Sequence, residues 1–78
     1  MAKSKNITEE RTLKIANKIK QLRVAKNYTS LEDFANDHEL NRIQYWRMEK
    51  GCNFTINSLT KILDIHKMTL AEFFKDID

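Results

Sequence analysis

Residues 31–51 decide the fold of this chain, and they read LEDFANDHELNRIQYWRMEKG. Their apolar positions recur at the i, i+3, i+4 and i+7 spacing of one helix face and predict a short helix over residues 31–38. That face consists of Leu31, Phe34, Ala35 and His38. Asn41, with a glutamine three residues later, has the spacing of a capping box and begins a second helix over residues 42–50. Gly51, the only glycine, stands where a left-handed residue would stop this helix.

Three further helices are predicted around this pair. Their ranges are about 9–26, 56–64 and 70–77. Their apolar stripes are Ile15, Ile19 and Leu22, then Leu59, Ile62 and Leu63, then Leu70, Phe73 and Phe74. Their caps are Thr8, then Thr55 or Asn57, then Thr69 in a capping box with Glu72. We therefore expect an all-α fold, a compact five-helix bundle over residues 8–78, behind a disordered basic tail over residues 1–7.

The composition excludes several classes of protein. Seventy-eight residues, of which 41% are hydrophobic, leave room for one small core. One glycine and no proline disfavour a β-sandwich or barrel, which needs many tight turns. No apolar run reaches membrane-spanning length and no signal sequence is visible, so we expect a cytoplasmic protein. One cysteine and two scattered histidines are too few for a zinc site. No catalytic motif is present, so we expect no enzyme, no metal, no cofactor and no small-molecule ligand.

The charged residues fall into blocks. The net charge is +3, but Lys and Arg predominate over residues 1–26 and 40–61, and Asp and Glu over residues 27–39 and 62–78. Such alternation fits a protein with one face directed at a polyanion and another turned away from it. It fits an ordinary solvated helical surface equally well.

The two short helices and their turn of about three residues have helix-turn-helix dimensions. The helix order and several motifs resemble the phage-repressor-like family (lambda repressor, Cro and xenobiotic-response-element type). The residues that carry the resemblance are Leu22-Arg23, Phe34-Ala35, Leu40-Asn41-Arg42, Tyr45, Arg47-Met48-Glu49-Lys50-Gly51, Ser58-Leu59, Lys61-Ile62-Leu63 and Phe73-Phe74. The resemblance covers roughly residues 9–76. It implies a transcriptional regulator, expected to be a repressor, that binds double-stranded DNA as a homodimer on a pseudo-palindromic operator.

The chain departs from the family pattern in three ways. Glu39 stands where the family often places a glycine, so we expect a slightly different turn. Leu31 stands where the family often has a DNA-contacting glutamine, so that contact is expected to be lost or to move to Thr29 or Ser30. The segment from Arg23 to Ala35 is one residue longer than in the shortest members.

Helical geometry predicts which face of the helix over residues 42–50 reads DNA. If Tyr45 and Met48 point inward, the outward residues at 100° per residue are Arg42, Ile43, Trp46, Arg47 and Lys50. The expected base contacts are Arg42, Ile43, Arg47 and Trp46, with the arginines bonding guanine and Ile43 meeting a thymine methyl. For Trp46, contact with the sugar-phosphate backbone, packing on a neighbouring helix and a partner surface remain alternatives.

Polar residues near the helix starts are candidates for phosphate contacts. They are Thr29, Ser30, Asn41, Gln44, Asn53, Thr55 and Asn57, with charge added by Lys50 and Lys61. Ser30, Asn41 and Thr55 also suit a purely capping role. The resemblance further implies a structural pair between Arg23 and Glu49, which would hold the recognition helix on the first helix.

Two alternatives concern protein partners. Met68, Phe73, Phe74 and Ile77 either form a homodimer surface on the last helix or close the core. The whole domain is alternatively a protein-interaction module on the same fold, such as an antitoxin or adaptor. Leu31 and Trp46, which are apolar on the expected DNA face, favour the module. The basic residues Arg42, Arg47 and Lys50 favour DNA.

Overall fold

The computed structural model describes residues 7–52 and 54–77, and it contains five helices and no strand over these residues. The helices are α1 (Ile7–Ala25), α2 (Leu31–Asp37), α3 (Arg42–Lys50), α4 (Ile56–Ile65) and α5 (Leu70–Phe74). The predicted all-α, five-helix fold is confirmed.

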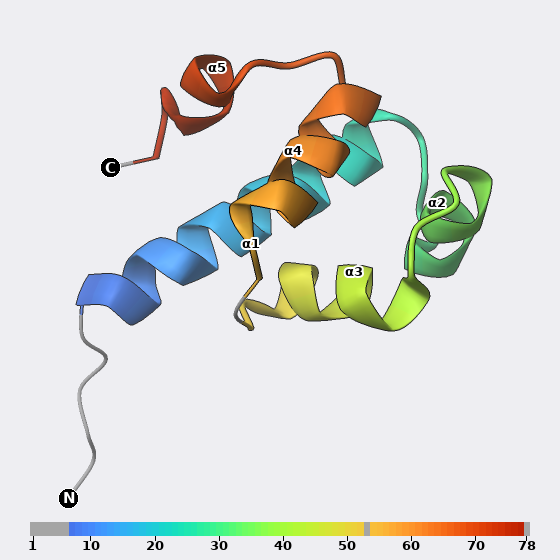
Figure 1. Ribbon diagram of the computed structural model, residues 1–78, viewed down its shortest axis with the longest axis horizontal. Helices are drawn as coiled ribbons and strands as arrows, with labels where there is room; N and C mark the ends of the chain where they lie inside the picture. Colours follow the sequence, from blue (N-terminus) through green and yellow to red (C-terminus); the bar gives the residue numbers. More distant parts are fainter. Residues whose placement is uncertain (1–6, 53, 78) are drawn as a thin grey trace, which may run out of the picture.

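The long helix α1 forms the spine of the molecule (Figure 1). α2 lies beyond its C-terminal end, α4 crosses in front of its middle, and α3 packs against both α1 and α2. α5 contacts α4 and joins α1 through Lys18, whose Nζ is 3.7 Å from Asp76 and 5.7 Å from the Phe73 ring centroid. The side chains buried between the helices are Ile19, Phe34, Tyr45, Met48, Leu59, Ile62, Leu63 and Phe73.

Four of these helices end in the same motif. A residue with positive φ follows α1, α2, α3 and α4; these residues are Asn27 (71°), Glu39 (57°), Gly51 (86°) and Lys67 (54°). After α2, the amide of Glu39 donates to the Asn36 carbonyl at 3.2 Å and that of Leu40 to the Ala35 carbonyl at 2.8 Å. The other three ends repeat this pair of bonds, which is the Schellman motif.

Only one of the four left-handed positions carries glycine. At Gly51 the choice is steric as well as conformational, because a Cβ there would lie 2.9 Å from Leu13 Cδ2 on α1. At Glu39 the helix-turn-helix turn adopts the backbone conformation that suits glycine, at a cost of roughly 1–2 kcal/mol for a residue with a Cβ. Glu39 thus takes a left-handed φ without being glycine.

A hydroxyl or amide side chain caps each of α2 to α5. The caps are Ser30, Asn41, Thr55 and Thr69, and each accepts from the amide three residues later. Thr69 and Glu72 form the full capping box. At α3 the predicted box is wrong, because the Gln44 side chain donates to Ser58 Oγ instead. That bond ties α3 to α4.

Three predictions about the helix ends need correction. α1 begins at Ile7, so Thr8 lies within its first turn and is not its cap, and the rest of the predicted tail lies outside the described residues. α5 ends at Phe74 rather than residue 77, and Ile77 packs against the core from the following turn. Leu70, predicted to face inward, is 43% exposed. A five-residue helix barely exceeds one turn and buries only Phe73 completely.

Candidate nucleic-acid interface

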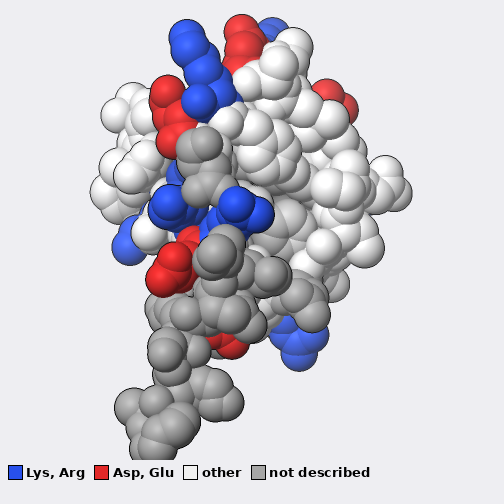
Figure 2. Space-filling model, turned by 90° about the vertical axis from the view of Figure 1, so that its left-hand side faces the viewer, with Lys and Arg blue, Asp and Glu red and all other residues white. Residues whose placement is uncertain are grey.

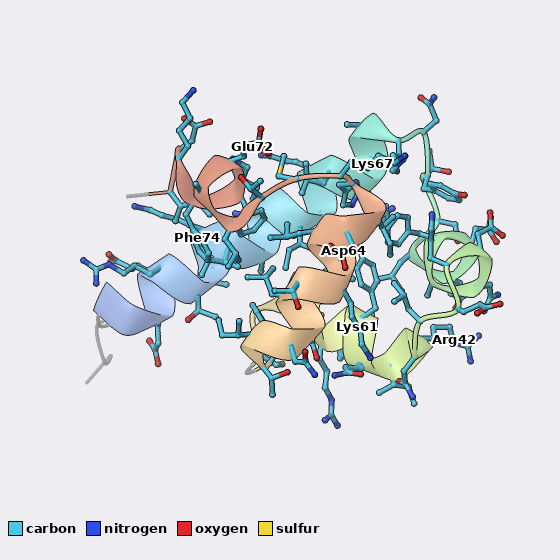
Figure 3. All side chains as sticks on the ribbon, turned by 45° about the horizontal axis from the view of Figure 1, so that its top comes forward. Arg42, Lys61, Asp64, Lys67, Glu72 and Phe74 are labelled. Atoms are coloured by element: carbon cyan, nitrogen blue, oxygen red, sulfur yellow. The ribbon has the colours of Figure 1, made fainter. Side chains whose placement is uncertain are left out.

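One face of α3 is free of the protein core. Tyr45 and Met48 are buried on its inner side, as predicted. Its outward side chains are all exposed; they are Arg42, Ile43, Trp46, Arg47 and Lys50. α3 lies along one edge of the molecule, with α2 at its start and α4 beside it (Figure 1). Figure 3 shows Arg42 at the α2 end of this edge.

The size and chemistry of this face suit the major groove of DNA. A nine-residue helix is about 13 Å long, and its diameter matches the groove width. Ile43 is 63% exposed between basic neighbours, which is unfavourable in water and favourable against a thymine methyl. Arg47 and Ile43 line one shallow hollow with Asn41, Gln44, Phe54 and Thr55.

A buried ion pair holds α3 against α1. Arg23 Nε donates to Glu49 Oε2 at 2.7 Å and Arg23 Nη2 to Glu49 Oε1 at 3.1 Å, so the contact is bidentate. Both side chains are buried, with exposed fractions of 6% for Arg23 and 5% for Glu49. Arg23 Nη1 also donates to the Tyr28 carbonyl at 2.8 Å. One guanidinium thus fixes α1, α3 and the segment before α2.

Tyr45 lies on the inner side of α3, beside this ion pair. Its hydroxyl is buried and has no hydrogen-bond partner among the described residues. Burial first, and then the neighbouring Glu49, raise the pKa of Tyr45 far above its usual range. Hydrogen bonding to Glu49 raises the pKa of Arg23 as well. The phenol therefore stays neutral and the guanidinium stays charged at every physiological pH.

Polar side chains link the starts of α3 and α4. Asn41 Oδ1 accepts from the Gln44 amide at 2.8 Å, and Gln44 Nε2 donates to Ser58 Oγ at 2.7 Å. Thr55 Oγ1 donates to Ser58 Oγ at 3.1 Å. Three predicted phosphate contacts, Asn41, Gln44 and Thr55, are thus brought together in one network. Ser58 joins it, and sequence reasoning missed Ser58 because its partner lies on another helix.

The remaining predicted phosphate contacts are more dispersed. Thr29, Asn57, Lys50 and Lys61 are exposed, and Ser30 is half-buried as a cap. Asn53 lies outside the described residues. Figure 3 shows Lys61 on α4, on the side toward α3, where it borders a groove of about 470 Å³ with Gln44 and Ser58.

The structure corrects one prediction near this face. Leu31 is half-buried and packs against the core, so it is not a free apolar residue of the DNA side. Cys52 is exposed just beyond α3. Phe54, which sequence reasoning did not select, packs against the core and lines the hollow beside Arg47.

Neither a metal-binding cluster nor a membrane-spanning helix is found among the described residues. They contain no group of three His, Cys, Asp or Glu side chains that could hold a metal ion. Over the same residues, no helix combines the length and the apolar character that crossing a membrane requires.

Comparison with known proteins gives one relative. No family model and no solved structure matches the chain. Control protein C.MunI of a Mycoplasma species is 37% identical over 67 residues, which are 85% of this chain and 90% of that protein. The chain belongs to the family of this control protein. The control-protein family is a helix-turn-helix family related to phage repressors, so the resemblance is confirmed at that level.

Membership of the control-protein family indicates a DNA-binding regulator. A control protein is a DNA-binding regulator rather than an enzyme. The match spans most of the chain, so it includes most of the helices described above.

Proposed function

We propose that this chain is a transcriptional regulator that binds double-stranded DNA sequence-specifically and controls restriction–modification genes. The observation that carries the proposal is the outward face of α3. Two arginines, one lysine and a 63%-exposed isoleucine stand on it, above a buried ion pair that fixes the helix. Such a face would insert into the major groove with the N-terminal part of α3 foremost.

Each residue of the interface takes a role that follows from its chemistry. Arg42 and Arg47 form bidentate bonds to guanine, worth about 1–3 kcal/mol of discrimination each, and Ile43 meets a thymine methyl. Phosphates meet the polar residues around the starts of α2, α3 and α4 and the two lysines beside them. This set comprises Thr29, Ser30, Asn41, Gln44, Lys50, Asn53, Thr55, Asn57 and Lys61.

The regulator acts as a homodimer on a pseudo-palindromic operator, and we expect it to repress transcription in the cytoplasm. Its dimer surface lies on α5 and the segments beside it. Phe73 is fully buried and cannot contribute, which corrects the predicted surface. Leu70, exposed at 43%, takes its place beside the half-buried Met68, Phe74 and Ile77. Figure 3 shows Phe74 beneath α5, on the side toward α1.

Charge supports this location of the dimer surface. The end of the molecule that carries the start of α1 and α5 mixes both signs of charge and leaves a broad area without charged side chains (Figure 2). Mixed charge would not repel a second copy, whereas the basic face of α3 would.

The alternative of a protein-interaction module rested on two apolar residues, Leu31 and Trp46, and only Trp46 remains in its favour. Leu31 packs against the core and offers no partner surface. Trp46 remains exposed at 48%, but its neighbours on α3 are basic. The DNA-binding proposal therefore accounts for more of this face.

Selection of duplexes from a random DNA library by the purified protein, at two salt concentrations, tests the proposal. We expect an inverted repeat with half-sites about one helical turn apart. Recovery of no motif, with weak binding that vanishes at physiological salt, would reduce the interaction to polyanion attraction and would contradict sequence-specific regulation.

A further inference from the structure

The only tryptophan of the chain lies against a lysine on the outer face of α3. Lys50 Nζ is 5.6 Å from the centroid of the Trp46 ring, within the range of a cation–π interaction. The two residues are four positions apart and therefore neighbours on one helix face. Both are exposed, so the core does not hold either side chain in place.

The pair occupies a defined part of the helix surface. With Tyr45 and Met48 inward, Lys50 lies near the centre of the outward face, and Trp46 lies on one flank of it. Arg47 lies on the other flank, where it lines the hollow at the start of α4. The indole is thus directed away from the hollow that Arg47 and Ile43 share.

We propose that Trp46 is a positioning residue that holds the Lys50 ammonium against a DNA phosphate, and that it does not read a base. The inference rests on the proposed DNA-binding function. In a helix-turn-helix, the N-terminal residues of the recognition helix reach the base edges. Lys50 ends the last turn of α3, far from Arg42, and so faces the rim of the groove, where phosphates lie.

The indole of Trp46 restricts the conformations of the Lys50 side chain before DNA binds. A lysine is a point charge on a flexible stem, and fixing that stem on binding costs conformational entropy. An ammonium already held over an aromatic ring has lost part of this freedom before DNA arrives. Trp46 would therefore strengthen a charged contact although it carries no charge itself.

The salt dependence of binding separates positioning from base reading. Each phosphate contact adds about 0.9 to the magnitude of the slope of log K against log salt concentration on B-DNA. Removing an indole that only touches a base leaves this slope unchanged. Removing an indole that holds a phosphate-bound lysine lowers the slope.

The experiment compares five variants with the wild type on the best duplex from the selection. They are Lys50→Met, Trp46→Leu, Trp46→Phe, the double variant Trp46→Leu/Lys50→Met, and the control Lys20→Met. Trp46→Leu keeps apolar bulk without an aromatic face, and Trp46→Phe keeps a weaker one. Lys20 lies on α1, beside Asn17 and Val24 and outside the outward face of α3, and its removal changes the net charge equally.

We expect Lys50→Met to lower the slope by about 0.9 per bound protomer and to weaken binding about 3- to 10-fold at low salt. Trp46→Leu should lower the slope in the same direction, and Trp46→Phe should restore part of it. The double variant should lose no more than Lys50→Met, and Lys20→Met should keep the wild-type slope.

A second measurement tests the pair in the free protein. An ammonium beside the indole attracts iodide, so Lys50→Met should reduce quenching of Trp46 fluorescence by iodide and leave quenching by neutral acrylamide unchanged. Equal iodide quenching in both proteins would overturn the inference.

Two outcomes on DNA would also overturn it. An unchanged slope in Trp46→Leu with an altered base preference would make Trp46 a base reader. An unchanged slope with reduced stability alone would make its role structural. In both cases sequence-specific binding survives, whereas the absence of any selected motif would overturn the proposed function and this inference together.

Discussion

Arg23 on α1 and Glu49 on α3 meet through two hydrogen bonds of 2.7 and 3.1 Å in a site that is closed to solvent on both sides of the contact. Each residue lies in the last turn of its helix, since α1 ends at Ala25 and α3 at Lys50. The pair therefore joins the C-terminal parts of the longest helix and the recognition helix, and it sets the angle at which α3 faces outward.

Glu49→Leu should destabilise the fold by about 3 kcal/mol, because it leaves the Arg23 guanidinium buried without its counter-charge. The double variant Arg23→Met/Glu49→Leu should recover most of this loss, since no isolated charge remains. Urea unfolding followed by Trp46 fluorescence measures both. Equal stability of wild type and Glu49→Leu would mean that solvent reaches the guanidinium.

Glu39→Gly should stabilise the fold by about 0.5–1 kcal/mol. Glycine relieves the cost of the left-handed conformation at φ 57°, and the greater entropy of the unfolded glycine chain offsets part of that gain. Glu39→Ala is the matched control and should bring no such gain, because it keeps a Cβ. Thermal unfolding would contradict the prediction if the two variants had the same midpoint.

Stability should fall at acidic pH through His66. Its ring stacks on Phe34 with centroids 5.6 Å apart, and its buried Nε2 has no partner among the described residues. Burial first, and then the charges of Lys26 and His38, lower the pKa of His66 from 6.5. The unfolded chain therefore binds more protons at His66 than the folded chain does. The contribution of the neutral His66 ring to the free energy of unfolding is complete above about pH 6.5 and is lost as the pH falls below that value.

His66→Phe should remove this part of the pH dependence, since phenylalanine can stack on Phe34 but cannot titrate. Urea unfolding between about pH 8 and pH 5 measures the dependence. A variant that loses stability with acid as steeply as the wild type would assign the effect to other groups.

Arg47→Ala should weaken binding to the selected duplex by about 1–3 kcal/mol and relax the preference at one base pair of each half-site. Competition against duplexes mutated at each position measures both effects. Lys20→Ala, on α1 and outside the outward face of α3, should change neither the base preference nor the rank order of the duplexes. A uniform loss across all sequences would instead place Arg47 on a phosphate.

Local signals explain what the sequence could predict. The apolar stripes and the capping residues Ser30, Asn41, Thr55 and Thr69 act within a few residues, so five helices and the outward face of α3 follow from them. The exposure of Leu70 and the early end of α5 depend on how a short helix meets the rest of the core. No local pattern carries that information.

Local patterns could not predict contacts between elements or side-chain conformations for the same reason, and the Arg23–Glu49 pair was expected only from the family resemblance. Gln44 has the spacing of a capping box, yet its amide finds Ser58 on α4. The Trp46–Lys50 contact depends on the conformation of a lysine stem. Left-handed stops at Asn27, Glu39 and Lys67 were missed because glycine is the usual sequence signal for them, whereas Gly51 carried that signal.

The shared ending of the first four helices has a consequence for proteolysis. A protease must draw several residues of backbone into an extended form, and here the amides of each left-handed residue and of the residue after it are already bonded to the preceding helix. Lys26 and Lys67 lie in two of these connections with exposed side chains, which trypsin recognises. Their peptide bonds are nonetheless locked in tight reversals, so cleavage there has to wait until the helix end itself unwinds.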